Sequence, residues 1–112
     1  MPDLDAEDQK LVTLARSARA RAGAEEGAAV RDTDGRTYSA ATVDQPSFKL
    51  TAVQAAVAAA LSSGAEGLEA AAVVTGDALV AEASVHAVRD VAETAPIILA
   101  DPKGDVVEVL NR

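Results

Sequence analysis

Two short apolar segments, residues 68–74 and 96–100, constrain the fold of this chain more than any other feature of its sequence. The first has the sequence Leu-Glu-Ala-Ala-Ala-Val-Val and the second Pro-Ile-Ile-Leu-Ala. Each is short and largely apolar, and each is followed by a turn-forming segment, a pattern typical of central strands that are covered on both faces. The sequence therefore predicts a sheet with helices on both sides.

Three amphipathic segments supply the predicted helices. Their expected bounds are Asp3 or Asp5 to about Ala22, Ser47 or Leu50 to Ser63, and Ser84 to about Glu93, with Ser84 as the cap of the third. Their apolar residues recur at helical spacing. The positions that we expect to be buried are Leu11, Leu14, Ala15, Ala18 and Ala22, then Leu50, Val53, Val57, Ala60 and Leu61, then Val85, Val88, Val91 and Ala92.

A hairpin and a final strand complete the predicted elements. Two β-type segments, 27–31 and 36–43, flank Asp-Thr-Asp-Gly at 32–35, and glycine adopts the positive φ that a tight turn requires. Residues 105–110 predict the last strand. The order α-β-β-α-β-α-β-β indicates an α/β fold with a mixed sheet, in a single domain over residues 1–112. The Asp-Thr-Asp-Gly segment also resembles the start of a calcium loop, but Val43 stands at the twelfth position, where such a loop needs Glu.

Charge and composition exclude several classes of function. The chain has 10 Lys and Arg against 18 Asp and Glu, which gives a net charge of −8. This charge argues against general nucleic-acid binding and against attraction to anionic membranes. No segment approaches the roughly 20 apolar residues of a membrane span. The first ten residues lack a hydrophobic signal core, so we expect a cytoplasmic protein. The sequence has no Cys and one His, which excludes Cys-containing zinc sites and a two-His metal clamp.

The scarcity of aromatic side chains bears on assembly. Only 2% of the residues are aromatic, so Ala and Val must fill the core. Because Ala buries little apolar area, we expect a monomer of marginal stability. Self-association would bury more apolar surface, and a homo-oligomer is therefore expected.

Several strings, spread in order over residues 11–110, together resemble one known family. They are Leu-Val-Thr-Leu-Ala-Arg at 11–16, Gly-Ala-Ala-Val at 27–30, Asp-Gly-Arg at 34–36 with Tyr38, Thr-Val-Asp-Gln at 42–45 with Ser47 and Phe48, Ala-Ala-Val-Val at 71–74, and Pro-Ile-Ile-Leu-Ala at 96–100. In sequence and spacing they resemble the cytidine deaminase family. The resemblance implies a three-layer α/β/α sandwich and an assembly of two or four subunits.

The resemblance also implies a zinc site that this sequence does not preserve. In that family a Cys-Ala-Glu or His-Ala-Glu string at the second helix and Pro-Cys-x-x-Cys at the third hold Zn²⁺, and the Glu carries the proton. Two registers are possible at the second helix: the first ligand and the Glu correspond to Val53 and Ala55, or to Thr51 and Val53. Val85 and Val88 stand where the two cysteines would be. We therefore expect no cofactor.

These substitutions lead to the expected function. Val53, Val85 and Val88 would hold the two helix starts together by packing instead of through a metal ion. The chain is then a relative without deaminase activity, which acts by binding an unknown protein partner or by mixed assembly with an active deaminase.

Two alternatives from other classes stay open. Thr42 and Asp44 correspond to the family's Asn and Glu that hold the ribose hydroxyls, so a nucleoside-binding module is possible, although both could simply satisfy local backbone groups. Loop 23–27 lacks the family's aromatic residue. An enzyme with different chemistry would use the remaining titratable candidates, Asp44, Asp77, Glu82 or His86, although a solvated surface position is the simpler interpretation of His86.

The first predicted helix carries a cluster of basic residues. Lys10, Arg16, Arg19 and Arg21 give the first helix a positive side in an acidic protein. Such a side is usually a solvated face and occasionally a docking patch for an acidic partner or RNA.

Overall fold

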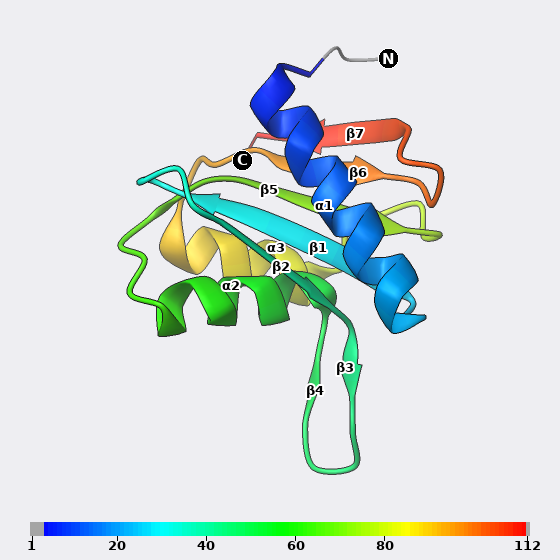
Figure 1. Ribbon diagram of the computed structural model, residues 1–112. Coiled ribbons are helices and arrows are strands. Elements are labelled where there is room, and N and C mark those ends of the chain that lie inside the picture. Colours follow the sequence, from blue (N-terminus) through cyan, green and yellow to red (C-terminus); the bar gives the residue numbers. More distant parts are fainter. Residues whose placement is uncertain (1–3, 112) are drawn as a thin grey trace.

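A five-stranded sheet lies between two layers of helices in the computed structural model, which describes residues 4–111 (Figure 1). Helix α1 (Ala6–Ala22) covers one face, and helices α2 (Ala52–Ser62) and α3 (Glu82–Val91) cover the other. The strands lie in the order β2-β1-β5-β6-β7. Their bounds are β1 Glu26–Asp32, β2 Thr37–Ala41, β5 Leu68–Thr75, β6 Ile97–Ala100 and β7 Val106–Leu110. The predicted three-layer α/β/α sandwich is confirmed.

The sheet is mixed, as predicted. Strands β5 and β6 pair in parallel, and the other neighbouring strands pair antiparallel. The parallel pair aligns residues 71–74 with residues 97–100, and all eight are buried. The two apolar segments of the sequence are therefore the central strand β5 and its parallel interior neighbour β6, with helices on both faces of the sheet.

Side chains of β5 alternate between two cores. Ala71 and Val73 face α2 and α3, whereas Ala70, Ala72 and Val74 face α1. Small side chains in the sheet let α1 lie very close to β1, and Gly27 is the point of nearest approach. A Cβ atom on Gly27 would lie 2.0 Å from the carbonyl oxygen of Ala15, so only glycine fits beneath α1 there.

The bounds of α1 follow from its caps. Asp5 is the N-cap, and its side chain accepts a hydrogen bond of 2.8 Å from the N–H of Asp8. The other predicted cap, Asp3, lies outside the described residues. The helix ends at Gly23, which has a left-handed φ of 62°. Ala22, which we expected to be buried, is exposed at this end.

The other two helices depart from the predictions in detail. Leu61 is 48% exposed, because it lies at the edge of the α2–α3 layer and not beneath it. Val85, Val91 and Ala92 are only half-buried. Helix α3 begins at Glu82, two residues before the predicted start, and its N-cap is Ala81. Ser84 is therefore not a cap.

A second hairpin, which the sequence analysis missed, connects β2 to α2. Strands β3 (Val43–Asp44) and β4 (Lys49–Leu50) pair antiparallel and project away from the sheet (Figure 1). The Asp44 carboxylate lies 3.4 Å from the Lys49 ammonium group. Phe48, near the tip, is 58% exposed.

The predicted turn at 32–35 is confirmed. The buried Asp32 carboxylate accepts hydrogen bonds from the N–H groups of Asp34 and Arg36, at 2.9 Å each, and from the Tyr38 hydroxyl at 2.8 Å. Burial alone would raise the pKa of Asp32, but these hydrogen bonds outweigh it and hold the pKa below its ordinary range. Across residues 4–111, no helix has the length and apolar character needed to cross a membrane.

Candidate functional site

The starts of α2 and α3 meet through two hydroxyl groups. Thr51 is the N-cap of α2, and its Oγ1 accepts a hydrogen bond of 3.1 Å from the Gln54 N–H. Gln54 Oε1 in turn accepts a hydrogen bond of 2.9 Å from the Thr51 N–H, which completes a capping box. The Ser84 hydroxyl, buried in the first turn of α3, donates to Thr51 Oγ1 at 2.8 Å. This bond joins the two helix starts.

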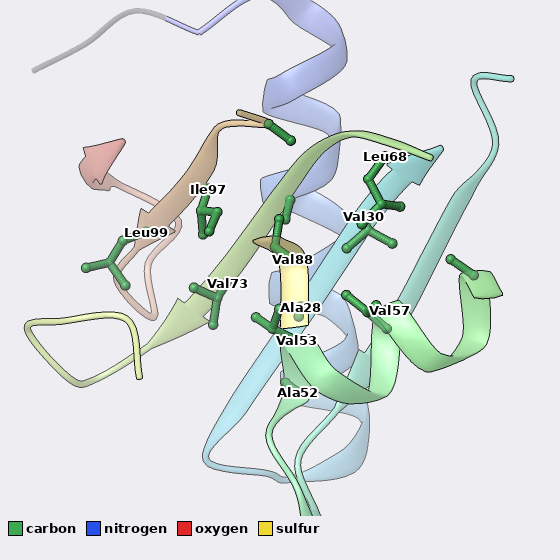
Figure 2. Close-up of a cluster of buried hydrophobic side chains, with 14 residues drawn as sticks. Ala28, Val30, Ala52, Val53, Val57, Leu68, Val73, Val88, Ile97 and Leu99 are labelled. Atoms are coloured by element: carbon green, nitrogen blue, oxygen red, sulfur yellow. The ribbon is translucent and has the colours of Figure 1, made fainter. Parts of the chain in front are cut away.

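Apolar side chains pack behind this hydroxyl pair. Val53 and Val88 are fully buried and lie in the core between the helices and the sheet, beside Ala28 and Val73 (Figure 2). Val85 is half-buried against the same core. The predicted apolar contact is therefore confirmed for Val53 and Val88 and holds in part for Val85.

These side chains do not fit the zinc ion that the resemblance implies. Proteins hold Zn²⁺ with thiolates, imidazoles or carboxylates. Thr51 and Ser84 offer neutral hydroxyls already bonded to each other, and the neighbouring valines offer no donor atom. Over the described part of the chain, no three His, Asp or Glu side chains lie together as a metal-binding group. Both registers keep the first ligand position at this junction, because Thr51 bonds to Ser84 and Val53 packs in the same core as Val88.

A pocket of about 370 Å³ opens beside the hydroxyl pair, between the β3–β4 hairpin and the start of α2. Its polar lining includes Glu26, Thr42, Asp44, Thr51, Gln54 and Asp77. Thr42 and Asp44, the two predicted ligand-binding residues, are thus in one pocket together with Asp77. Glu82 and His86 do not line it and are exposed on α3.

Both predicted ligand-binding side chains already have local partners. Thr42 Oγ1 accepts a hydrogen bond of 3.0 Å from the Glu26 N–H and donates at 3.4 Å to the Glu26 carbonyl oxygen. The exposed Asp44 carboxylate pairs with Lys49. A ligand in the pocket would therefore compete with interactions that tie together β1, β2 and the hairpin.

Glu26 is an acid in the pocket whose pKa is shifted by its surroundings. Its burial at the edge of the sheet raises its pKa, and the negative charges of Asp77 and Glu25 act in the same direction. Hydrogen bonds from the Thr75 hydroxyl and from the Ala52 N–H, at the amino end of α2, offset part of this effect. The net result is a pKa above the ordinary value of a glutamate.

Sequence reasoning missed Glu26 and Gln54 as lining residues. Gln54 carried a usable signal, because Thr51-x-x-Gln54 is the capping-box pattern that marks a helix start. Glu26 carried none, since it is one of many acids and only the β1–β5 pairing brings it beside Thr75.

Comparison with known proteins agrees with this fold. The family model described as "Cytidine deaminase-like" matches residues 4–104. The solved cytidine deaminase of Burkholderia pseudomallei superimposes with a TM-score of 0.80 at 23% identity, over 91% of this chain and 90% of that one. For the cytidine deaminase of Mycobacterium leprae the TM-score is 0.72 at 21% identity, over 96% and 93% of the two chains.

A third similar structure is the cytidine deaminase of Mycobacterium tuberculosis, with a TM-score of 0.70 at 24% identity, over 93% of this chain and 89% of that one. No curated protein sequence matches the chain at a significant level. At these identities the structural neighbours establish the fold alone, whereas the family model covers most of the sequence. The chain therefore belongs to the cytidine deaminase-like family.

Proposed function

We propose that this protein is a family member that does not deaminate cytidine and acts by binding other protein subunits, as a homo-oligomer or in mixed assembly with an active deaminase. The observation that supports this proposal is the hydrogen bond of 2.8 Å between Ser84 Oγ and Thr51 Oγ1, backed by Val53 and Val88. It occupies the junction where the family resemblance implies metal ligands.

The chemistry of deamination gives the reason. Attack on C4 of cytosine needs a metal-activated water and a carboxylate that carries its proton. Neither register supplies these groups: Val53 and Ala55, or Thr51 and Val53, stand where the first ligand and the carboxylate would be. Glu26 brings a carboxylate into the same pocket, but the hydroxyls and valines beside it cannot activate a water.

Cytidine turnover on the purified protein tests the loss of activity. We expect no conversion above that of a buffer blank, with the wild-type chain and with Glu26→Gln alike. Glu26 is the pocket acid with the raised pKa, so conversion by the chain itself would depend on it. Conversion by a contaminating deaminase would be the same in both preparations. Robust conversion that Glu26→Gln abolishes would overturn the proposal.

The proposed assembly is supported by an apolar groove between α2 and α3. It has a volume of about 230 Å³, and its apolar lining includes Leu50, Val57, Leu61 and Val91. Leu61 is 48% exposed there and adjoins the other apolar side chains of the groove, so a subunit that covers the groove buries a contiguous apolar surface. The acidic chain disfavours a nucleic-acid partner and leaves a protein surface as the candidate occupant, either a second copy or a related deaminase.

Light scattering on the purified protein tests this assembly with a matched pair of variants. Leu61→Gln removes apolar surface from the groove, and Leu79→Gln does so at a loop position that is 71% exposed. We expect Leu61→Gln to lower the oligomer fraction and Leu79→Gln to leave it unchanged. An equal effect of both substitutions, or a wild-type monomer that captures no deaminase subunit, contradicts the proposal.

The pocket itself favours a second candidate, a nucleoside-binding module, because it brings Thr42 and Asp44 together. A ligand at 100 times its Kd adds about 2.7 kcal/mol of stability, which a thermal-shift screen against nucleosides detects. This candidate requires a shift with wild type that Asp44→Ala abolishes and that Asp34→Ala, in the distant 32–35 turn, leaves intact. No shift with any nucleoside removes it.

A further inference from the structure

A second pocket lies on the opposite side of the sheet, between α1 and the turn that joins β6 to β7. Its volume is about 330 Å³, and its polar lining includes Thr13, Arg16, Ser17 and Lys103. The charged side chains that line it are Arg16 and Lys103, both positive, in a chain whose net charge is −8. The charged side chains of the pocket therefore have the opposite sign to the net charge of the chain.

Arg16 is held in place over the turn. Its Nε donates a hydrogen bond of 3.3 Å to the carbonyl oxygen of Pro102. Its aliphatic stem passes Gly104, where a Cβ atom would lie 3.5 Å from Arg16 Cδ. In residues 4–111, the terminal guanidinium nitrogens form no ion pair or other hydrogen bond. Arg16 thus presents the charged N–H donors of its two terminal nitrogens at the pocket.

The turn between β6 and β7 carries the second cation, Lys103, and its carboxylate, Asp101, is bonded within the turn. Asp101 Oδ1 accepts hydrogen bonds from the N–H groups of Lys103, at 2.9 Å, and Asp105, at 3.0 Å. The Asp101 side chain therefore closes the turn and does not line the pocket. Within the described chain, the Lys103 ammonium group has no acidic partner within 4.0 Å.

Ser17 adds a neutral donor to the two cations. Its hydroxyl makes no hydrogen bond within the part of the chain that the structure covers, whereas that of Thr13 donates to the Gln9 carbonyl oxygen at 3.2 Å. Buried Val12 forms an apolar part of the lining. A guanidinium, an ammonium group and a hydroxyl around a hollow match the oxygens of a phosphate monoester.

We propose that this pocket binds the phosphate group of a small phosphorylated molecule. RNA is a poorer match, because the basic side chains of α1 do not form one continuous track: Arg19 turns to the Glu25 carbonyl oxygen, with its Nε at 3.0 Å. The proposal is independent of the loss of deaminase activity and of the assembly proposed above.

Calorimetric titration with phenyl phosphate at fixed ionic strength tests the site. Arg16→Gln and Lys103→Gln each remove a proposed contact, and Arg21→Gln removes an equal charge from an α1 residue that does not line the pocket. We expect saturable binding that each of the first two substitutions weakens about tenfold, the effect of losing one charge-assisted hydrogen bond. Arg21→Gln should bind as wild type does, and circular dichroism checks that every variant is folded.

Amide chemical shifts in the same titration locate the ligand. They should move in α1 and in residues 101–105 and stay unchanged around the Thr51–Ser84 junction. The absence of saturable binding at phenyl phosphate concentrations up to about 10 mM overturns the proposal. An equal loss in Arg21→Gln, or tighter binding of a single-stranded RNA that depends on Arg21, also overturns it.

Discussion

At the scale of single residues, Thr51 combines a local interaction with a distant one. Its capping box with Gln54 is local, and the sequence pattern alone could have predicted it. Its bond with Ser84 joins positions 33 residues apart, and only the packing of α2 against α3 creates that contact. The sequence could therefore exclude the zinc ligands but could not predict the hydroxyl pair that joins the helix starts.

A double-mutant cycle measures what the hydroxyl pair contributes. Thr51→Val removes the cap and leaves the buried Ser84 hydroxyl without its acceptor, so we expect a loss of about 1–3 kcal/mol in the free energy of unfolding. Ser84→Ala should cost about 0.5–1.5 kcal/mol. Urea denaturation of both single variants and the double variant should give a coupling of about 1 kcal/mol. Thr51→Ser, which keeps the hydroxyl, is the control, and purely additive losses would contradict direct contact.

Glu26 gives the site a pH-dependent contribution to stability. Because its pKa is raised, the folded protein binds this proton more tightly than the unfolded chain does. Its stabilising contribution is present at low pH and is lost as the pH rises from the ordinary pKa through the raised one. We therefore expect Glu26→Gln to melt at a higher temperature than wild type at pH 7.

That difference should disappear below about pH 4, where the unfolded glutamate is also protonated. Thermal denaturation at a series of pH values measures it. If Glu26→Gln is less stable than wild type at pH 7, the folded protein favours the Glu26 anion, which contradicts a raised pKa.

At the scale of elements, the sequence predicted what periodicity and composition determine. The central strands, the three helices and the 32–35 turn were predictable because apolar spacing and turn residues mark them. The β3–β4 hairpin was not, since each strand has two residues, too few for an alternating pattern, and Pro46 suggested only a loop. The residue type of Ser84 predicts a cap, whereas its hydroxyl donates a hydrogen bond to Thr51 of the neighbouring helix α2.

The contact between α1 and β1 depends on Gly27. In Gly27→Ala the new methyl group would meet backbone atoms of Ala15 and Arg19, which cannot move without displacing α1. We expect a loss of about 1–3 kcal/mol, the usual cost of overpacking. Gly76→Ala is a matched control, because a Cβ there has no atom within 4 Å. Denaturant unfolding compares the two, and equal stabilities would show that α1 lies farther from the sheet.

At the scale of the whole molecule, net charge and apolar surface oppose each other in assembly. A charge of −8 on each copy disfavours self-association at low salt, whereas the α2–α3 groove favours it. Salt screens the repulsion and leaves apolar burial largely intact. Sedimentation should therefore show tighter self-association at about 0.5 M NaCl than at about 0.05 M. Weaker association at high salt would indicate an interface built from ion pairs instead.

Whether the starts of α2 and α3 can hold a metal ion is tested by the zinc content of the purified full chain after equilibration with Zn²⁺ and exhaustive dialysis. Two variants serve as positive controls, each with Val85→Cys and Val88→Cys and with either Thr51→Cys or Val53→Cys, because each supplies three thiolates at the helix starts. We expect the wild-type protein to retain far less than one zinc ion per chain. One tightly held zinc ion per wild-type chain, lost in Thr51→Val, would contradict this expectation.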